Sequence, residues 1–148
     1  MPITQISVFL DNRPGSLFDA MSQLDRNEIK VFALTIADAG EFGLVRLITD
    51  DPQKTAKLLE DADFNLAKSK KNIEVTAFFV SNHAHISKVT KILGDEGMNI
   101  EYAYSSAVHV DGKVALIVRI NDTEKAEKLL AAKGIEVLTL EQLKRYFT

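Results

Sequence analysis

The residues Asp11-Asn12-Arg13-Pro14-Gly15-Ser16-Leu17 have the types and spacing of a turn that could hold a charged small group. An apolar segment precedes the turn and a helical pattern of apolar residues follows it, so the turn joins a strand to a helix. Pro14 suits the first turn of a helix, and Gly15 lets another molecule approach the backbone because it has no Cβ. Free N–H groups at a helix start suit a carboxylate or a phosphate. A tight connection with a helix N-cap would explain the same residues without a ligand.

Three histidines, His83, His85 and His109, are the other side chains that could do chemistry, as ligands of a metal. His83 and His85 lie two apart with no carboxylate at a familiar ligand spacing, so we interpret them as loop histidines that face solvent. The acidic pairs in Asp50-Asp51 and Asp61-Ala62-Asp63 are explained by helix caps and helix ends. The sequence shows no nucleophile with a base, no P-loop and no metal-ligand set. We therefore expect no catalysis and no cofactor.

The composition of the 148 residues is typical of a soluble protein with an ordinary core, with 46% hydrophobic and 26% charged residues. The net charge of -3 and the lack of a large Lys/Arg cluster argue against nucleic acid as a partner. The absence of cysteine excludes disulfides and thiolate sites. No signal peptide pattern is visible, and no apolar run approaches the ~20 residues that span a bilayer. We expect a cytoplasmic protein with no membrane partner.

The elements around the turn come from a sequence that occurs twice. Residues 50–59 read like residues 121–130, and residues 24–31 read like residues 93–100. We therefore divide the chain into a first domain of residues 1–70 and a second of residues 71–148, the latter with a short C-terminal helix. The join near residues 68–72 is short and structured, so we expect the two halves to pack tightly.

Each copy is predicted to have the order βαββαβ, an α+β fold in which both helices cover one face of an antiparallel sheet. In the first copy we expect strands at residues 3–10, 30–37, 42–49 and 64–67, and helices at residues 14–27 and from Pro52, capped by Asp50 or Asp51. In the second copy we expect strands at residues 73–80, 99–108, 114–120 and 135–139, and helices at residues 86–94, 123–132 and 140–147, with Gly134 as a C-cap.

Several strands are apolar on both faces, as residues 44–48 and 114–118 show. A sheet with water on one side should alternate apolar and polar residues, so something apolar must cover the face that the helices leave open. A second sheet, from a partner chain or from the other half, would do this. We favour a homodimer through the sheet faces.

The duplication, the βαββαβ order and the turn Asn12-Arg13-Pro14-Gly15-Ser16-Leu17 together resemble the ACT domain, a small amino-acid-sensing module. The resemblance covers nearly the whole chain as a tandem pair of ferredoxin-like units. It is strongest to stand-alone tandem ACT proteins through Leu34-Thr35-Ile36-Ala37-Asp38 and Phe42-Gly43-Leu44-Val45-Arg46-Leu47-Ile48. The resemblance implies an amino-acid-binding regulatory protein that has no catalysis of its own and that controls a metabolic enzyme.

The resemblance also implies a binding mode for the amino acid. The N–H groups of Gly15, Ser16 and Leu17 would meet the ligand carboxylate, and the side chain of Asn12 or Asp11 would accept from its ammonium group. Arg13 and Pro14 belong to the same turn. The ligand would lie against strand two of a neighbouring copy, where Asn99, Ile100, Tyr102 and Tyr104 would select its side chain. Tyr102 and Tyr104 share one strand face, and interface packing is the better explanation for one of them.

The second copy departs from the family pattern, because the alignment places Ala84-His85 opposite Pro14-Gly15 with one residue deleted. We therefore expect one amino acid per chain. A ferredoxin-like fold also hosts small hydrolases of the acylphosphatase type, which would use Arg13 and an asparagine from the region of strands two and three. A ligand-free dimeric scaffold is the third alternative.

Overall fold

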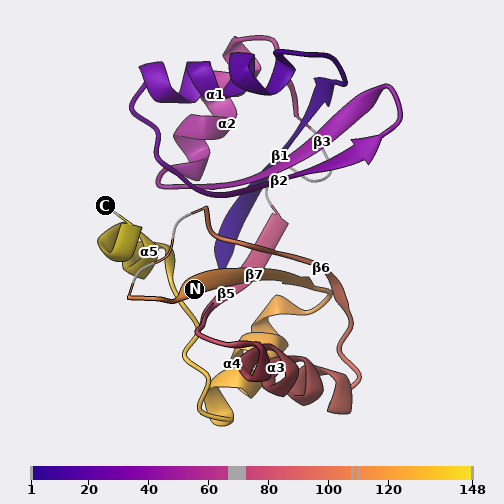
Figure 1. The fold of residues 1–148 in the computed structure, drawn as a ribbon, viewed down its shortest axis with the longest axis vertical. Helices are drawn as coiled ribbons and strands as arrows, with labels where there is room; N and C mark the ends of the chain where they lie inside the picture. The colour runs from indigo at the N-terminus through magenta and orange to yellow at the C-terminus, as the bar shows by residue number, and fades with distance from the viewer. Residues whose placement is uncertain (1, 67–72, 108, 110, 148) are drawn as a thin grey trace. The chain divides into compact units, whose positions relative to one another are not determined.

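The computed structural model describes residues 2–66, 73–107, 109 and 111–147. The chain forms two compact units, one of residues 4–73 and the other made mainly of residues 74–148 (Figure 1). The expected join at residues 68–72 and the domain boundary at residue 70 lie outside the described residues. Within the described residues, no helix has the length and apolar character needed to cross a membrane.

The first unit has the predicted order βαββαβ. Its elements are β1 (Ile3–Asp11), α1 (Ser16–Arg26), β2 (Val31–Ala39), β3 (Phe42–Thr49), α2 (Pro52–Asp61) and β4 (Asn65–Leu66). The strands pair antiparallel in the order β4-β1-β3-β2, and α1 and α2 lie on one face of the sheet (Figure 1). Asp51 caps α2 as predicted, because its carboxylate accepts a hydrogen bond of 3.0 Å from the backbone N–H of Lys54.

The second unit repeats this order up to its last strand. Its elements are β5 (Ile73–Val80), α3 (His83–Asp95), β6 (Ile100–Ser105), β7 (Val114–Ile120), α4 (Thr123–Ala132) and α5 (Leu140–Phe147). The strands pair in the order β5-β7-β6. The predicted strand at residues 135–139 is wrong: the segment makes one isolated bridge, Leu138 to Ala77. The segment is followed directly by a capping box at the start of α5, in which Thr139 and Gln142 exchange hydrogen bonds.

Each unit has its own core, made where the inward residues of the strands pack against the two helices. The buried apolar residues of the first are Ile6, Val8, Leu10, Ala20, Leu24, Ile29, Val45, Leu47, Leu59 and Leu66. Those of the second are Phe78, Val80, Val89, Leu93, Met98, Val118, Ile120, Ala126, Leu130 and Ile135. Corresponding elements supply both sets, which supports duplication of one fold.

The face of the second sheet that lies away from α3 and α4 is covered in part by α5. Phe78 belongs to the helix-side core, so its neighbour Phe79 points to the other face. There the Tyr146 ring of α5 packs edge-on against Phe79 at a centroid distance of 5.0 Å. The cover at Phe79 is therefore a helix, where the sequence analysis expected a second sheet.

Helices α1 to α4 all end in the same left-handed turn. The residue in this turn has a positive φ in each case: Glu28 (60°), Asp63 (66°), Gly97 (71°) and Gly134 (82°). The next N–H bonds back to the carbonyl five residues earlier, as in Ile29 to Leu24 and Met98 to Leu93, both 2.9 Å. This is the Schellman arrangement, and it confirms Gly134 as a helix-ending glycine.

Replacing Glu28 by Gly is expected to stabilise the first unit by about 1 kcal/mol, because a side chain strains the left-handed conformation that glycine adopts freely. Gly97→Glu, at the equivalent turn, is expected to destabilise the second unit by about the same amount. Urea unfolding followed by circular dichroism measures both changes. A Glu28→Gly variant less stable than the wild type would show that Glu28 makes a contact worth more than its strain.

Glu127 makes the second unit sensitive to pH. Burial raises the pKa of Glu127 above its ordinary value of 4.5, against the opposing effect of a 2.9 Å hydrogen bond donated by Thr76 Oγ1. The contribution of Glu127 to stability is therefore complete below pH 4.5 and is lost as the pH rises through its folded pKa.

Glu127→Gln keeps an acceptor for Thr76 and removes the half-buried charge. Its free energy of unfolding should exceed that of the wild type at neutral pH, and the two should converge below pH 4.5. Glu124→Gln is the control, because Glu124 is exposed on the same helix and its pair with Lys128 lies at the surface. Equal stability of Glu127→Gln and wild type at neutral pH would contradict the prediction.

Candidate functional site

The loop between β1 and α1 places a left-handed glycine at the start of the helix. β1 ends at Asp11, α1 begins at Ser16, and Gly15 is the N-cap with φ 87° and ψ -12°. Pro14 therefore lies before the helix, and the prediction that it occupies the first turn is wrong, because the left-handed Gly15 must first reverse the chain. A Cβ on Gly15 would meet no atom within 4 Å, so the space beside this backbone is open.

The N-terminus of α1 carries no side-chain cap among the described residues. The first helical bond runs from the N–H of Asp19 to the carbonyl of Gly15 at 2.9 Å, and the N–H of Ser16 makes a long bond of 3.3 Å to Arg13. The N–H groups of Leu17 and Phe18 have no acceptor within the helix. This helix end therefore keeps donors and partial positive charge for an anion.

Asn12 connects the loop to the β2–β3 turn instead of capping the helix. Its backbone N–H donates to Glu41 at 2.9 Å, and its Nδ2 donates to the carbonyl of Gly40 at 3.2 Å. The simple N-cap interpretation of Asn12 is therefore wrong. The bond from Nδ2 fixes the amide and keeps its Oδ1 as an acceptor.

A hollow of about 220 Å³ adjoins this loop and contains charges of both signs. Arg13 Nε lies 3.6 Å from Asp11 Oδ2, and Arg13 Nη2 lies 3.9 Å from Asp19 Oδ2. All three side chains are more than half exposed, so these pairs are weak and can exchange partners. A guanidinium can bind a carboxylate and a carboxylate can accept from an ammonium group, so the hollow has groups for both ends of a zwitterion.

Ser16 and Leu17 have different roles in this site. Ser16 is buried and lines the hollow, whereas the half-buried Leu17 packs its side chain against the core of the unit. Only the backbone of Leu17 is left to meet a ligand.

The second part of the predicted site, on β6, is not presented on one surface. Asn99 is exposed just before the strand, and Ile100 packs against the helix-side core. A register shift between Ile100 and Tyr102 turns the following residues over, so Tyr102 and Tyr104 lie on the opposite face with their rings stacked at 6.5 Å. The prediction that the two tyrosines share a face is confirmed, and Ile100 lies on the opposite one.

In the equivalent loop of the second unit, the side chain of Asn82 caps the start of the helix. α3 begins at His83, and the carboxamide of Asn82 accepts a 3.1 Å hydrogen bond from the N–H of His85. His83 and His85 therefore lie in the first helical turn, not in a loop, and the helical cap that corresponds to Gly15 is Asn82, not His85. Among the described residues, no group of three or more His, Cys, Asp or Glu side chains could hold a metal.

The hydrolase alternative finds no support in the first unit. Arg13 is present but lies between two carboxylates, and β2 and β3 contain no asparagine. The asparagines of the described part of this unit are at Asn12, Asn27 and Asn65, all outside these strands.

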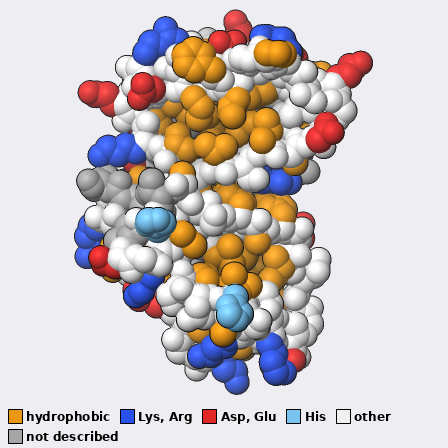
Figure 2. Space-filling model, in the orientation of Figure 1, with side chains coloured by type: hydrophobic (Ala, Val, Ile, Leu, Met, Phe, Trp, Pro, Cys, Tyr) orange, Lys and Arg blue, Asp and Glu red, His pale blue; other side chains and the backbone are white. Residues whose placement is uncertain are grey.

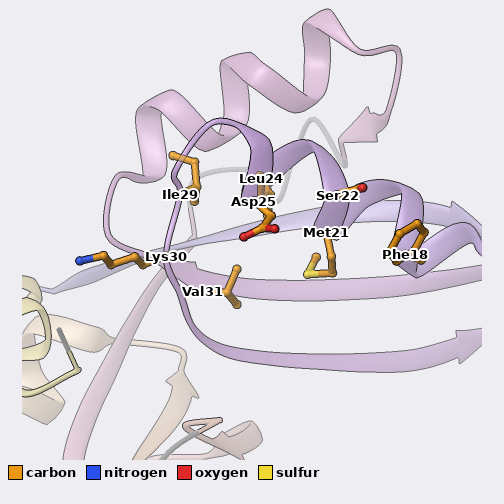
Figure 3. A pocket seen from close by; sticks show the side chains of 8 residues that line it. All are labelled: Phe18, Met21, Ser22, Leu24, Asp25, Ile29, Lys30 and Val31. Atoms are coloured by element: carbon orange, nitrogen blue, oxygen red, sulfur yellow. The ribbon is translucent and has the colours of Figure 1, made fainter.

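A groove between α1 and β2 was missed by the sequence analysis. Hydrophobic side chains gather there (Figure 2), and Met21, Asp25 and Val31 extend into the groove (Figure 3). The volume of the groove is about 600 Å³. Phe18 is 72% exposed at its rim, and Ile36 on the edge strand β2 is 52% exposed. Phe18 lies off the Leu17, Met21 and Leu24 stripe that packs inward, and this was the available signal.

Comparisons with known proteins match the whole of this arrangement. The family model for an ACT domain pair matches residues 1–146. The crystal structure of protein BT0572 from Bacteroides thetaiotaomicron has 30% identity, a TM-score of 0.85, and coverage of 97% of this chain and 96% of that chain.

The fold is also shared with two more distant structures. The ligand-free regulatory subunit of aspartate kinase from Thermus thermophilus has 18% identity and a TM-score of 0.62, with 90% of this chain and 92% of that chain covered. The regulatory subunit from Thermus flavus has 17% identity and a TM-score of 0.58, with coverage of 100% and 94%. No curated protein matches the sequence. The chain belongs to the ACT domain family, as a pair of ACT domains.

Proposed function

We propose that this protein binds a free amino acid at the β1–α1 loop of its first ACT domain and acts as a regulatory protein without catalysis of its own. Loss or gain of the ligand would change its contacts with a cytoplasmic metabolic enzyme. The structural relatives described as regulatory subunits of aspartate kinase support a regulatory role for this fold.

The observation that carries the proposal is the open backbone at Gly15 beside the mixed-charge hollow. The N–H groups of Gly15, Leu17 and Phe18 provide a carboxylate site, and a Cβ at residue 15 would occupy the open space next to it. Asp11 and the Asn12 amide oxygen offer acceptors for the ammonium group. Asn99 and Tyr102 remain the proposed side-chain contacts, contributed by a neighbouring copy, whereas Ile100 packs against the core of its own unit.

A panel of the common amino acids, added singly in a thermal-shift assay, tests this proposal. At least one amino acid should raise the melting temperature, because a ligand that binds only the folded state stabilises it. Calorimetry with that amino acid should give one site per chain, since Asn82 closes the second loop. No shift with any amino acid would contradict the proposal, and turnover of an acyl phosphate would favour the hydrolase.

We also propose that the protein is a homodimer. We predicted the contact on the sheet faces, but Leu116 packs against the helix-side core, and Ile117, on the other face, is 1% exposed in the chain. The α1–β2 groove is the more open apolar surface, and β2 is an edge strand that a second chain can extend.

The grooves of two protomers are suited to packing against each other. Asp25 and Lys30 both line it, so a two-fold contact can set the carboxylate of one protomer against the ammonium group of its partner. Phe18 and Ile36 would supply the apolar contact. This is an isologous interface, because each chain contributes the same residues.

A further inference from the structure

The hollow beside the first loop has a counterpart in the second ACT domain with a different lining. The second hollow measures about 240 Å³, against about 220 Å³ for the first. Both lie at the end of the first strand of their unit, against Phe9 in one and Phe79 in the other, and both are bounded by the left-handed turn after the second helix, at Asp63 and Gly134. The duplication has therefore kept the cavity and its place.

The two hollows are lined by different charged residues. The first is lined by the carboxylates of Asp11, Asp19 and Asp63 and by the guanidinium of Arg13. In the second, Ser81 and Gly134 stand where the first has Asp11 and Asp63, and Lys113 and His85 join the lining. A hollow that presents an ammonium group, an imidazole and a hydroxyl has the donors to bind an anion.

Among the described residues, Glu136 is the carboxylate that lines the second hollow, and it already accepts a hydrogen bond. Glu136 Oε1 accepts a 3.0 Å hydrogen bond from Gln142 Nε2 of α5. Phe79, also in the lining, contacts Tyr146 of the same helix. α5 thus engages two lining residues, and a molecule in the hollow would lie against the residues that hold this helix.

We propose that a second ligand site lies in the hollow formed by Phe79, Ser81, His85, Lys113 and Glu136. It binds a small multiply charged anion, and the bound anion changes the contacts of α5. Lys113 and His85 hold the anion, and Ser81 donates to it. This site is independent of the amino-acid site, because it lies in the other ACT domain and recognises a different charge.

Calorimetry with inorganic phosphate and with malonate, in separate titrations of the full chain, tests the site. At least one of them should bind, with sodium chloride at matched ionic strength giving no saturable heat. Lys113→Gln and His85→Gln should each weaken binding at least about tenfold, because each removes a charge-assisted or polar contact. Lys125→Gln, an exposed lysine on α4, is the matched control and should bind as the wild type does.

The effect of the anion on α5 is measured by the fluorescence of Tyr146. The chain has three tyrosines, so Tyr102→Phe with Tyr104→Phe leaves Tyr146 as the single emitter. Its fluorescence should change with the same dependence on anion concentration as the heat. Absence of binding by both anions, equal binding by Lys113→Gln and wild type, or binding without a change in Tyr146 emission would each overturn the proposal. Failure of amino-acid binding would leave these results unaffected.

Discussion

Gly15→Val is expected to weaken amino-acid binding by at least about thirtyfold, because the loss of charge-assisted hydrogen bonds to a ligand carboxylate costs on the order of 2 kcal/mol. The valine side chain would fill the open space beside residue 15 and keep the carboxylate from the N–H groups of the first helical turn. The variant will also lose stability, since Gly15 has φ 87° and a β-branched residue is strained there.

Strain and binding are separated by a matched control. Gly112→Val places the same side chain at a second open, left-handed glycine, with φ 74°, in the β6–β7 turn of the other unit. It should lower the melting temperature similarly and leave affinity unchanged. Asn12→Ala should weaken binding less than Gly15→Val, because it removes one contact without blocking the site. If Gly15→Val binds as the wild type does, the loop is only a connection between β1 and α1.

Phe18→Asp is expected to convert the dimer into a monomer. Phe18 is 72% exposed at the rim of the α1–β2 groove, so its replacement costs the isolated chain little apolar burial. Aspartate in the first turn of α1 also favours the helix dipole, so folding should survive. In a two-fold contact, however, the aspartate of each protomer would be buried in the interface without a partner. Light scattering after size exclusion measures the mass.

Two further variants make the dimer test specific. Ile36→Lys, on the edge strand β2, should also give a monomer, because it puts a charge on the strand to be extended. Ile86→Asp, at a 40% exposed residue in the first turn of α3, is the control and should stay dimeric. A monomeric wild type would contradict the homodimer. A dimeric Phe18→Asp would contradict the α1–β2 interface and favour the contact through the sheet faces.

Most elements of the fold could be predicted from the sequence because residues close to each boundary determine where the element begins or ends. Residues 42–49, 73–80, 114–120, 123–132 and 140–147 were predicted with the observed bounds. Asp51 followed by Pro52 and the glycine at residue 134 mark helix ends by mechanisms that act within a few residues. The repeat then supported the same order of elements in the second copy, apart from its last strand.

The loops were less predictable, because more than one residue could begin the helix. In the first copy, Pro14 suggested an early start that the left-handed Gly15 prevents. In the second copy, Asn82 is an ordinary N-cap, so α3 begins three residues before the start predicted at residue 86. Similar sequences thus make an open helix end in one copy and a capped one in the other.

The faces of β6 depended on a tertiary detail. A strand of period two would put Ile100 and Tyr102 on one face, and the register shift against β7 separates them. The apolar groove at α1 and β2 was missed because it needs the position of Phe18 outside the inward stripe together with the edge position of β2, and only the folded unit shows both.

The central claim is that an amino acid binds at the start of α1, and ¹⁵N-labelled amide spectra test it most directly. The amino acid that most raises the melting temperature is titrated into the protein, and the amide signals of Gly15, Leu17 and Phe18 are followed. These amides should shift together and saturate at one ligand per chain, while His85, whose N–H is bonded to Asn82, should shift little. Saturable binding that leaves the Gly15, Leu17 and Phe18 amides unmoved would contradict the account.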